Sequence, residues 1–224
     1  MKLLSRMLAA AAAATLGAVA SVTMLSGPAL AATYSTGHID ILDLDYEGTA
    51  LSLNAKTYAG VTPVTDDLSP SGNVFRVLSS WTTTVPSGSS WSCLGPAGST
   101  MYVLPQDYDA AKLYPGWNTE DVASAQGPVK LELVSATSNP PGGRFTLYTT
   151  VKSGLVVVPT FRLNSNTAAG CNLPVWPGGI SAGGHGHSNF AFSQLGTYTV
   201  TFKATAQNGS GATTGNVVYT FQVG

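Results

Sequence analysis

The segment TYTVTFKATA, residues Thr197–Ala206, alternates polar and apolar side chains along its length. Because successive side chains of an extended chain point to opposite faces, Tyr198, Val200, Phe202 and Ala204 share one face of a predicted strand. Similar period-two runs recur along the sequence, separated by clusters rich in Gly, Pro, Asn and Ser. They predict strands at His38–Tyr46, Leu51–Thr57, Asn73–Leu78, Thr100–Leu104, Val129–Ser135, Arg144–Lys152, Leu155–Leu163, His187–Phe192, Thr197–Ala206 and Asn216–Val223.

Short strands with frequent turns predict an all-β fold, a single immunoglobulin-like antiparallel β-sandwich with long loops. At most one short helix is expected, beginning at Glu120 with Asn118 or Thr119 as its cap. Hydrophobic residues make up 44% of the chain, enough for a core, whereas charged residues at 9% are too few to cover long surface helices. No long linker or repeat interrupts residues 32–224, which are predicted to form a single β-sandwich domain.

Residues 1–31 have the pattern of a secretory signal peptide. Lys2 and Arg6 precede the apolar run 7–25, and Ala29-Leu30-Ala31 supplies the small residues that signal peptidase recognises. We expect cleavage after Ala31 and a secreted, extracellular or wall-associated product, with a retained membrane anchor as the alternative. No later apolar stretch is long enough to predict a transmembrane segment. Lys and Arg number 10 against 11 Asp and Glu, so no basic surface favours nucleic acid as a partner.

Two further features predict architecture rather than chemistry. Cys93 and Cys171 are the only cysteines, and in an oxidising compartment such a pair indicates a disulfide. A thiolate nucleophile or copper ligand is the less favoured alternative. Tyr198 follows the turn residue Gly196, a pattern by which sandwich domains hold a corner through a tyrosine hydroxyl.

The three histidines carry the strongest chemical signal. His185 and His187 are alternate residues, so on an extended backbone both imidazoles point to one side, at a spacing suited to one metal ion. His38 opens a predicted strand, and alternation places Asp40 beside it on a face that would otherwise be apolar. Three imidazoles, with Asp40 as a fourth ligand or as the partner that orients one of them, predict one zinc or copper site. Mg²⁺ and Ca²⁺ prefer shells made only of oxygen.

Other interpretations of these residues stay open. A His-x-His flanked by glycines also occurs in flexible surface loops, and a histidine opening a strand can be a solvated end. Three ligands plus a water resemble a hydrolytic zinc site, but no carboxylate near residues 183–192 offers a general base. No Gly-x-Ser-x-Gly elbow with a strand before it and a helix after it appears, so the sequence does not predict a serine hydrolase. Trp117 and Trp176 lie in predicted loops, where they either plug the end of the sandwich or stack on a sugar.

Several short motifs occur in order between residues 37 and 206: Gly37-His38-Ile39-Asp40, Leu94–Ser99, Val103–Gln106, Leu113–Thr119, Gly142–Phe145, His185–Phe192 and Leu195–Tyr198. Together they resemble the actinobacterial surface-anchored protein domain, which is also found in choice-of-anchor M proteins. His38, His185 and His187 match the histidine positions of that family, and Trp117-Asn118 matches its Trp-Asn motif. We expect the chain to differ from the family in having one domain without an anchor segment, and in its two cysteines.

The resemblance implies export to the actinobacterial cell envelope and a role beside metal-uptake ABC transporters. With the histidine pattern, it predicts a secreted protein that binds and hands on zinc or copper and is not an enzyme. The alternative function is a non-metal module that binds cell-wall glycan or a protein through Trp117 and Trp176. A zinc hydrolase or copper oxidoreductase is a third interpretation, which requires an open coordination position beside an acid or base.

Overall fold

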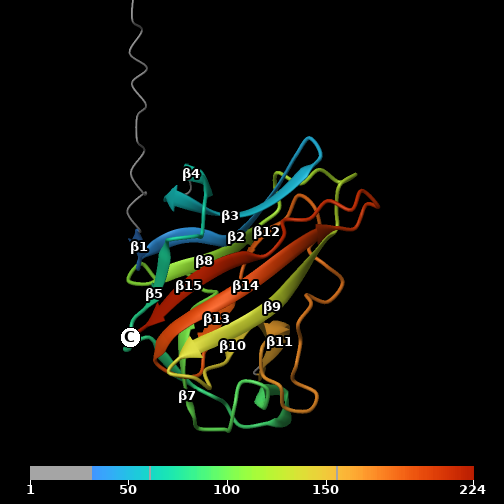
Figure 1. Ribbon diagram of the computed structural model, residues 1–224. Coiled ribbons are helices and arrows are strands. Elements are labelled where there is room, and N and C mark those ends of the chain that lie inside the picture. Colours follow the sequence, from blue (N-terminus) through green and yellow to red (C-terminus); the bar gives the residue numbers. More distant parts are fainter. Residues whose placement is uncertain (1–31, 61, 155) are drawn as a thin grey trace, which may run out of the picture.

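A computed structural model describes residues 32–60, 62–154 and 156–224 (Figure 1), so the predicted signal peptide 1–31 lies outside the described residues. The described chain forms β-strands and a single 3-10 turn, η1 (Ser89–Trp91). The strands are β1 (Thr33–Tyr34), β2 (Gly37–Glu47), β3 (Ala50–Ala59), β4 (Thr62–Leu68), β5 (Val74–Val77), β6 (Thr82–Thr84), β7 (Thr100–Leu104), β8 (Leu113–Asn118), β9 (Val129–Asn139), β10 (Phe145–Ser153), β11 (Val156–Asn164), β12 (His185–His187), β13 (Asn189–Phe192), β14 (Gly196–Ala206) and β15 (Val217–Val223).

The strands form three sheets of five strands each, which confirms the all-β prediction. Sheet 1 has the order β1-β5-β15-β14-β9, sheet 2 the order β11-β10-β13-β7-β6, and sheet 3 the order β12-β8-β2-β3-β4. The prediction of purely antiparallel pairing is wrong, because β2 pairs parallel to β8, and β5 pairs parallel to both β1 and β15. Parallel neighbours need long connections, which local alternation does not reveal. The immunoglobulin-like sandwich is not confirmed.

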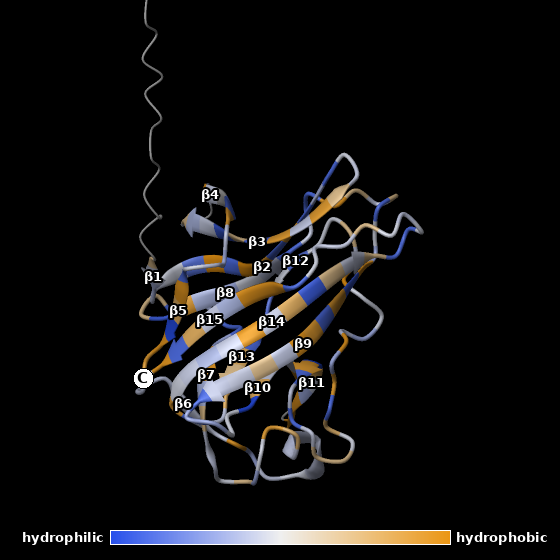
Figure 2. Ribbon diagram, in the orientation of Figure 1, coloured by the Kyte–Doolittle hydropathy of each residue, from blue (hydrophilic) through white to orange (hydrophobic). Residues whose placement is uncertain are grey.

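One buried cluster joins the three sheets. The ring of Phe145 in β10 contacts Phe202 of β14 and Phe221 of β15, which packs sheet 2 against sheet 1. Tyr219 of β15 donates a hydrogen bond of 3.0 Å to the carbonyl of Asn54 in β3, which packs sheet 1 against sheet 3. Figure 2 shows apolar and polar residues alternating along β14 and β9. Alternation therefore supplies one apolar face per strand, and these faces meet in a shared core.

Strand β2 carries a β-bulge. Its pairing with β3 shifts register between Asp40 and Asp43, so that Ile41 and Leu42 together lie opposite Ala55. All three apolar residues are buried in the core. A bulge places one extra residue in one strand and locally disrupts the alternation of side chains.

The bulge changes which residues of β2 share a face with His38, so the predicted face of this strand was wrong. Regular alternation predicted that only apolar residues would follow His38 and Asp40 on their side of the sheet. Because the bulge adds one residue, Asp43 and Asp45 follow them instead, and these two carboxylates are buried at 1% and 9% exposure. The face that carries the first histidine is therefore acidic.

The single strand predicted at His187–Phe192 is divided between two sheets. Strand β12 pairs with β8 in sheet 3, whereas β13 pairs with β7 and β10 in sheet 2. Fully buried Ser188 lies between the two strands. This change of sheet brings the His-x-His segment alongside β8, which in turn pairs with β2. Two histidines distant in sequence from His38 thereby reach its side of sheet 3.

Strand β8 was not predicted, because Pro115 and Gly116 argue against a central strand. No helix begins at Glu120, where at most one short helix was expected. In its place the Asn118 Oδ1 accepts a hydrogen bond of 2.6 Å from the Glu120 backbone N–H, and the Val122 N–H donates to the carbonyl of Thr119. Asn118 thus forms a side-chain turn with the backbone two residues on, which ends β8 without starting a helix.

Two predicted architectural contacts are confirmed. Cys93 and Cys171 form a disulfide, which points to an oxidising, extracellular environment. The Tyr198 hydroxyl donates a hydrogen bond of 3.0 Å to the carbonyl of Gln194 and so holds the corner before β14. Within the described ranges, no helix has the length and apolar character needed to cross a bilayer.

Candidate metal centre

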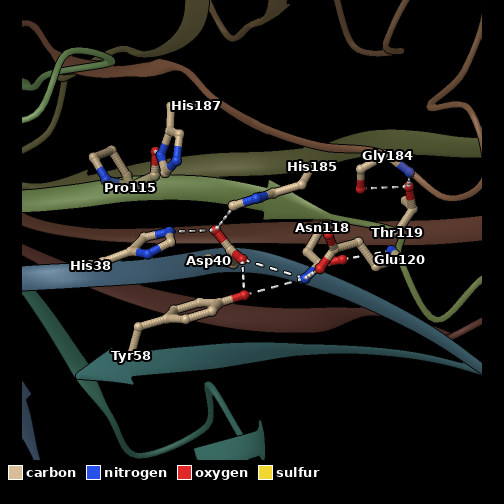
Figure 3. A network of polar contacts seen from close by, with 10 residues as sticks. All are labelled: His38, Asp40, Tyr58, Pro115, Asn118, Thr119, Glu120, Gly184, His185 and His187. Atoms are coloured by element: carbon tan, nitrogen blue, oxygen red, sulfur yellow. Dashed lines mark hydrogen bonds and ion pairs between the residues drawn. The ribbon is translucent and has the colours of Figure 1, made fainter. Parts of the chain in front are cut away.

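The three histidines come together at the end of sheet 3. His38 lies on β2, and His185 and His187 lie on β12, with β8 between the two strands. One ligand nitrogen from each imidazole lies within 4.8 Å of the others (Figure 3). The predicted convergence of these residues is confirmed, and the cluster can hold a metal ion.

Asp40 lies beneath this cluster and is fully buried. Its Oδ1 accepts hydrogen bonds from the Nε2 of His185 at 3.1 Å and from the Nε2 of His38 at 3.2 Å. Its Oδ2 accepts a 2.7 Å hydrogen bond from the Tyr58 hydroxyl and a longer one from the Asn118 amide (Figure 3). Every oxygen of this buried carboxylate therefore has a partner, as a buried charge requires.

The electrostatics of the cluster centre on Asp40. Burial acts to raise the pKa of Asp40, but hydrogen bonds from His185, His38 and Tyr58 outweigh it, so the pKa lies well below its usual range. The pKa of His185 is raised, chiefly by its hydrogen bond to Asp40. Burial lowers the pKa of His187, which favours the neutral imidazole that a metal needs.

The hydrogen bond of His187 indicates which nitrogen can bind an ion. Its Nδ1 lies 3.0 Å from the carbonyl oxygen of Pro115. A carbonyl only accepts, so Nδ1 carries the hydrogen and Nε2 keeps a free lone pair. A hydrogen bond of this kind fixes the tautomer and the ring orientation of metal-binding histidines.

Two tyrosines hold the imidazoles in place. The Tyr58 ring stacks on His38 with centroids 4.0 Å apart, and the Tyr114 ring stacks on His187 at 3.6 Å. Neither tyrosine was predicted as part of the site. Tyr58 follows directly after the predicted strand Leu51–Thr57, and Tyr114 lies in the strand that Pro115 concealed. For Tyr58 the missing signal was the correct end of the strand, and for Tyr114 it was the strand itself.

Two glycines leave room for the site. A Cβ at Gly116 would overlap the Oδ1 of Asp40, so only glycine lets the carboxylate lie across β8. A Cβ at Gly186 would approach the Trp117 ring to 2.7 Å, so the glycine of His-x-His allows the indole to pack against β12. Both positions thus require glycine because another side chain approaches the backbone closely there, and not because the chain must be flexible.

The segment before His185 is attached to the turn after β8. Thr119 donates from its Oγ1 to the carbonyl of Ser181 at 2.7 Å and accepts from the Gly184 N–H at 2.9 Å. Its backbone exchanges two further hydrogen bonds with Gly183 and Gly184, each 2.8 Å long. The interpretation of His-x-His as a free surface loop does not agree with these contacts.

The donor set suits zinc or copper. A tetrahedral zinc ion with bonds of about 2.0 Å places neighbouring ligand atoms about 3.3 Å apart. The 3.1 and 3.2 Å distances from Asp40 Oδ1 to the two Nε2 atoms match such an edge. Separations of up to 4.8 Å among the imidazole nitrogens exceed it, so ring rotations must complete the shell.

Trp117 and Trp176 do not form an exposed platform. Trp117 lies in β8 rather than in a loop, and Trp176 is only 5% exposed. The two rings meet edge to face at 5.7 Å, and the Arg162 guanidinium lies 5.3 Å from the Trp176 ring centroid. This packing supports the interpretation that these aromatics plug one end of the core.

Two further polar groups at the candidate metal centre were not predicted from the sequence. The Asn118 amide donates to the Glu120 carboxylate at 3.2 Å as well as to Asp40, which connects a second acidic group to the network (Figure 3). Glu120 also acts to raise the pKa of His185 through its charge. Asn118 was predicted as a helix cap and as part of the Trp-Asn motif but not as a member of the site, and the strand that positions it was not predicted.

No protein-family model, no curated protein and no solved structure matches this chain. The resemblance to actinobacterial surface-anchored domains therefore stays a prediction. Function rests on the geometry of the histidine cluster.

Proposed function

We propose that this protein binds one transition-metal ion, zinc by preference and copper as the second choice, through His38, His185 and His187. Asp40 is the fourth ligand or the group that orients the imidazoles. The observation that carries the proposal is the approach of all three histidines of the chain to within 4.8 Å around a buried carboxylate. Metal sites of this donor type bind Zn²⁺ or Cu²⁺ in preference to hard cations.

The role of Asp40 depends on which imidazole nitrogens hold the ion. If His38 and His185 bind through Nε2, the Oδ1 of Asp40, which lies 3.2 and 3.1 Å from these two atoms as a neighbouring ligand would, completes a four-ligand shell. If they bind through Nδ1, Asp40 accepts a hydrogen bond from each Nε2–H and strengthens both imidazoles as donors. In both arrangements the carboxylate supplies negative charge beside the ion.

The exposure of the site supports capture and release of the ion. The side chain of His185 is 30% exposed, whereas Asp40 is fully buried, so the ion is reached from the β12 side. The nearest carboxylate already accepts hydrogen bonds from two imidazoles and a tyrosine, which favours binding over a general-base reaction. The function is therefore metal binding and handling rather than catalysis.

The setting of this function is the outside of the cell. The predicted signal peptide 1–31 and the Cys93–Cys171 disulfide both support secretion, with the product free or associated with the cell wall. The resemblance to actinobacterial surface-anchored domains adds a metal-uptake ABC transporter as the partner that receives the ion. A cell-wall component is the alternative partner.

The test is metal analysis of the purified protein, followed by calorimetric titration of the chelator-treated protein with zinc and with copper. We expect one ion per chain, and loss of that binding in His38→Ala and His187→Ala. Asp109→Asn is the control, because this exposed carboxylate pairs with Lys112 outside the site. Flat titrations of the wild type with both metals would exclude the proposal. Circular dichroism establishes that each variant is folded.

A further inference from the structure

A surface hollow lies beside the Cys93–Cys171 disulfide and shares no residue with the histidine centre. Its volume is about 620 Å³, which is within the range of small-molecule sites. The lining comes from the loop 86–97 between β6 and β7, from Arg144 before β10, and from Asn166 and Ala168 after β11. We call this the Arg144 hollow.

Arg144 is the one charged residue that lines the Arg144 hollow. Its Nε is buried, and among the described residues nothing accepts a hydrogen bond from that atom. None of the ion pairs between described residues includes Arg144 either. A guanidinium that is partly shielded from water and has no acceptor is unfavourable until an anion compensates it. The hollow therefore offers an uncompensated positive charge to a ligand.

The other two arginines of the described ranges each have a partner. The Arg76 guanidinium donates to the backbone oxygen of Gly224 at 3.3 and 3.4 Å. The Arg162 guanidinium lies over the ring of Trp176, 5.3 Å from its centroid. The absence of a partner is therefore particular to Arg144 and is not a general property of arginines in this fold.

The walls of the Arg144 hollow are fixed in place before any ligand binds. The Asn166 amide donates a 3.0 Å hydrogen bond to the carbonyl of Cys93, and the disulfide ties the same loop to Cys171. The backbone N–H of Arg144 donates to the Ser193 Oγ at 2.8 Å, and its carbonyl accepts from the Ser193 N–H at 3.1 Å. A preformed site of this kind loses little conformational freedom on binding.

Gly95 allows the loop 86–97 to lie against the guanidinium. Its φ is 148°, and a Cβ at this position would lie 3.3 Å from the Nη2 of Arg144 and 3.2 Å from the Oγ of Ser99. Side chains rarely adopt such a backbone conformation, and glycine permits the close approach. The guanidinium is thus held at the wall of the hollow.

We propose that the Arg144 hollow binds the carboxyl terminus of a short peptide through the Arg144 guanidinium. One guanidinium compensates one negative charge, and its planar fork matches the two oxygens of a carboxylate. The lining has no aromatic ring on which a sugar could stack, whereas Pro86, Pro96, Ala97 and Ala168 supply apolar contacts for small peptide side chains. Capture of a terminal carboxylate is a recurrent mode of peptide recognition.

The test is a nuclear magnetic resonance titration of the purified, isotope-labelled protein with N-acetylated dialanine and with its carboxyl-terminal amide. We expect the acid to bind at least about 10-fold more tightly, because an ionised acceptor strengthens the hydrogen bonds of arginine. Arg144→Gln should abolish this preference, and Arg76→Gln, the matched control outside the hollow, should keep it. His187→Ala should also keep it, since the hollow is separate from the proposed metal centre.

The comparison of acid and amide on the wild type needs no variant, and the spectra show whether each variant is folded. Equal affinities for acid and amide, or a full preference in folded Arg144→Gln, would overturn the proposal. Shifted amide signals that lie outside residues 86–97, Arg144 and residues 166–168 would do the same. Tighter binding of N-acetylmuramic acid or of inorganic phosphate than of the dipeptide would show a sugar-acid or general anion site in its place.

Discussion

The Oδ1 of Asp40 lies 3.1 Å from the Nε2 of His185, although 145 residues separate them. The same oxygen accepts a hydrogen bond from His38, only two residues away. One buried carboxylate therefore links the imidazole of its own strand to an imidazole from the distant β12. This link makes Asp40 the residue on which the geometry of the metal centre depends.

Asp40→Asn should lower the affinity for zinc by about 10-fold to 100-fold, because the amide carries no negative charge and keeps only one acceptor oxygen for the imidazoles and the Tyr58 hydroxyl. Calorimetric titration with zinc measures the change. Asp109→Asn, which removes an exposed carboxylate paired with Lys112, should leave the affinity unaltered. An Asp40→Asn protein that binds zinc as tightly as the wild type would show that the carboxylate neither binds the ion nor orients the imidazoles.

Gly116→Ala should weaken zinc binding at least about 10-fold, because the new Cβ would overlap the Oδ1 of Asp40 and displace the carboxylate from both imidazoles. Gly209→Ala is the comparison. Gly209 has a φ of 83° and open space around its Cα, so alanine there should cost about 1 kcal/mol of stability without altering metal affinity. Equal zinc affinities in the two variants would contradict the close approach at Gly116.

Zinc affinity should fall as the pH falls, because protons compete with the ion for the imidazole nitrogens. The raised pKa of His185 makes this competition begin above the ordinary histidine value of 6.5, whereas His187, with its lowered pKa, stays neutral to lower pH. We expect an affinity at least about 10-fold lower at about pH 6 than at about pH 8, measured by titration in matched buffers.

The raised pKa of His185 has the opposite effect on the metal-free protein, which His185 stabilises most at low pH. Since the folded pKa of His185 is raised, its contribution to stability is complete below the unfolded value of 6.5 and is lost as the pH rises through the folded value. Urea unfolding of His185→Ala and wild type should show a difference that shrinks as the pH rises. A difference that grows with pH would mean that His185 does not gain its proton affinity from Asp40.

Removing the disulfide by Cys93→Ala with Cys171→Ala should lower the free energy of unfolding by about 4 kcal/mol, because the bridge joins residues 78 apart and limits the unfolded chain. Urea unfolding at neutral pH measures the loss. Zinc binding should survive in the folded fraction, since the bridge lies beside Asn164 of sheet 2 and not beside the histidines of sheet 3. Loss of zinc binding in a folded double variant would contradict this separation.

The candidate site was predicted from the sequence in its ligands but not in its surroundings. His38, Asp40, His185 and His187 were identified because residue type and two-residue spacing are local properties. Tyr114 and Asn118 were missed because Pro115 and Gly116 hide a strand that its pairing with β2 and β12 stabilises. The acidic face of β2 was missed because a bulge is visible only against the partner strand.

By itself, the sequence determined the all-β class, the strands with regular alternation such as Thr197–Ala206, the pairing of its only two cysteines, and the residue types able to bind a metal. The tertiary structure alone decided the parallel pairs, the change of sheet at Ser188 and the register of β2. The physical reason is the range of the interactions. Alternation follows from the geometry of neighbouring residues, whereas strand order and register follow from hydrogen bonds and packing between segments far apart in the chain.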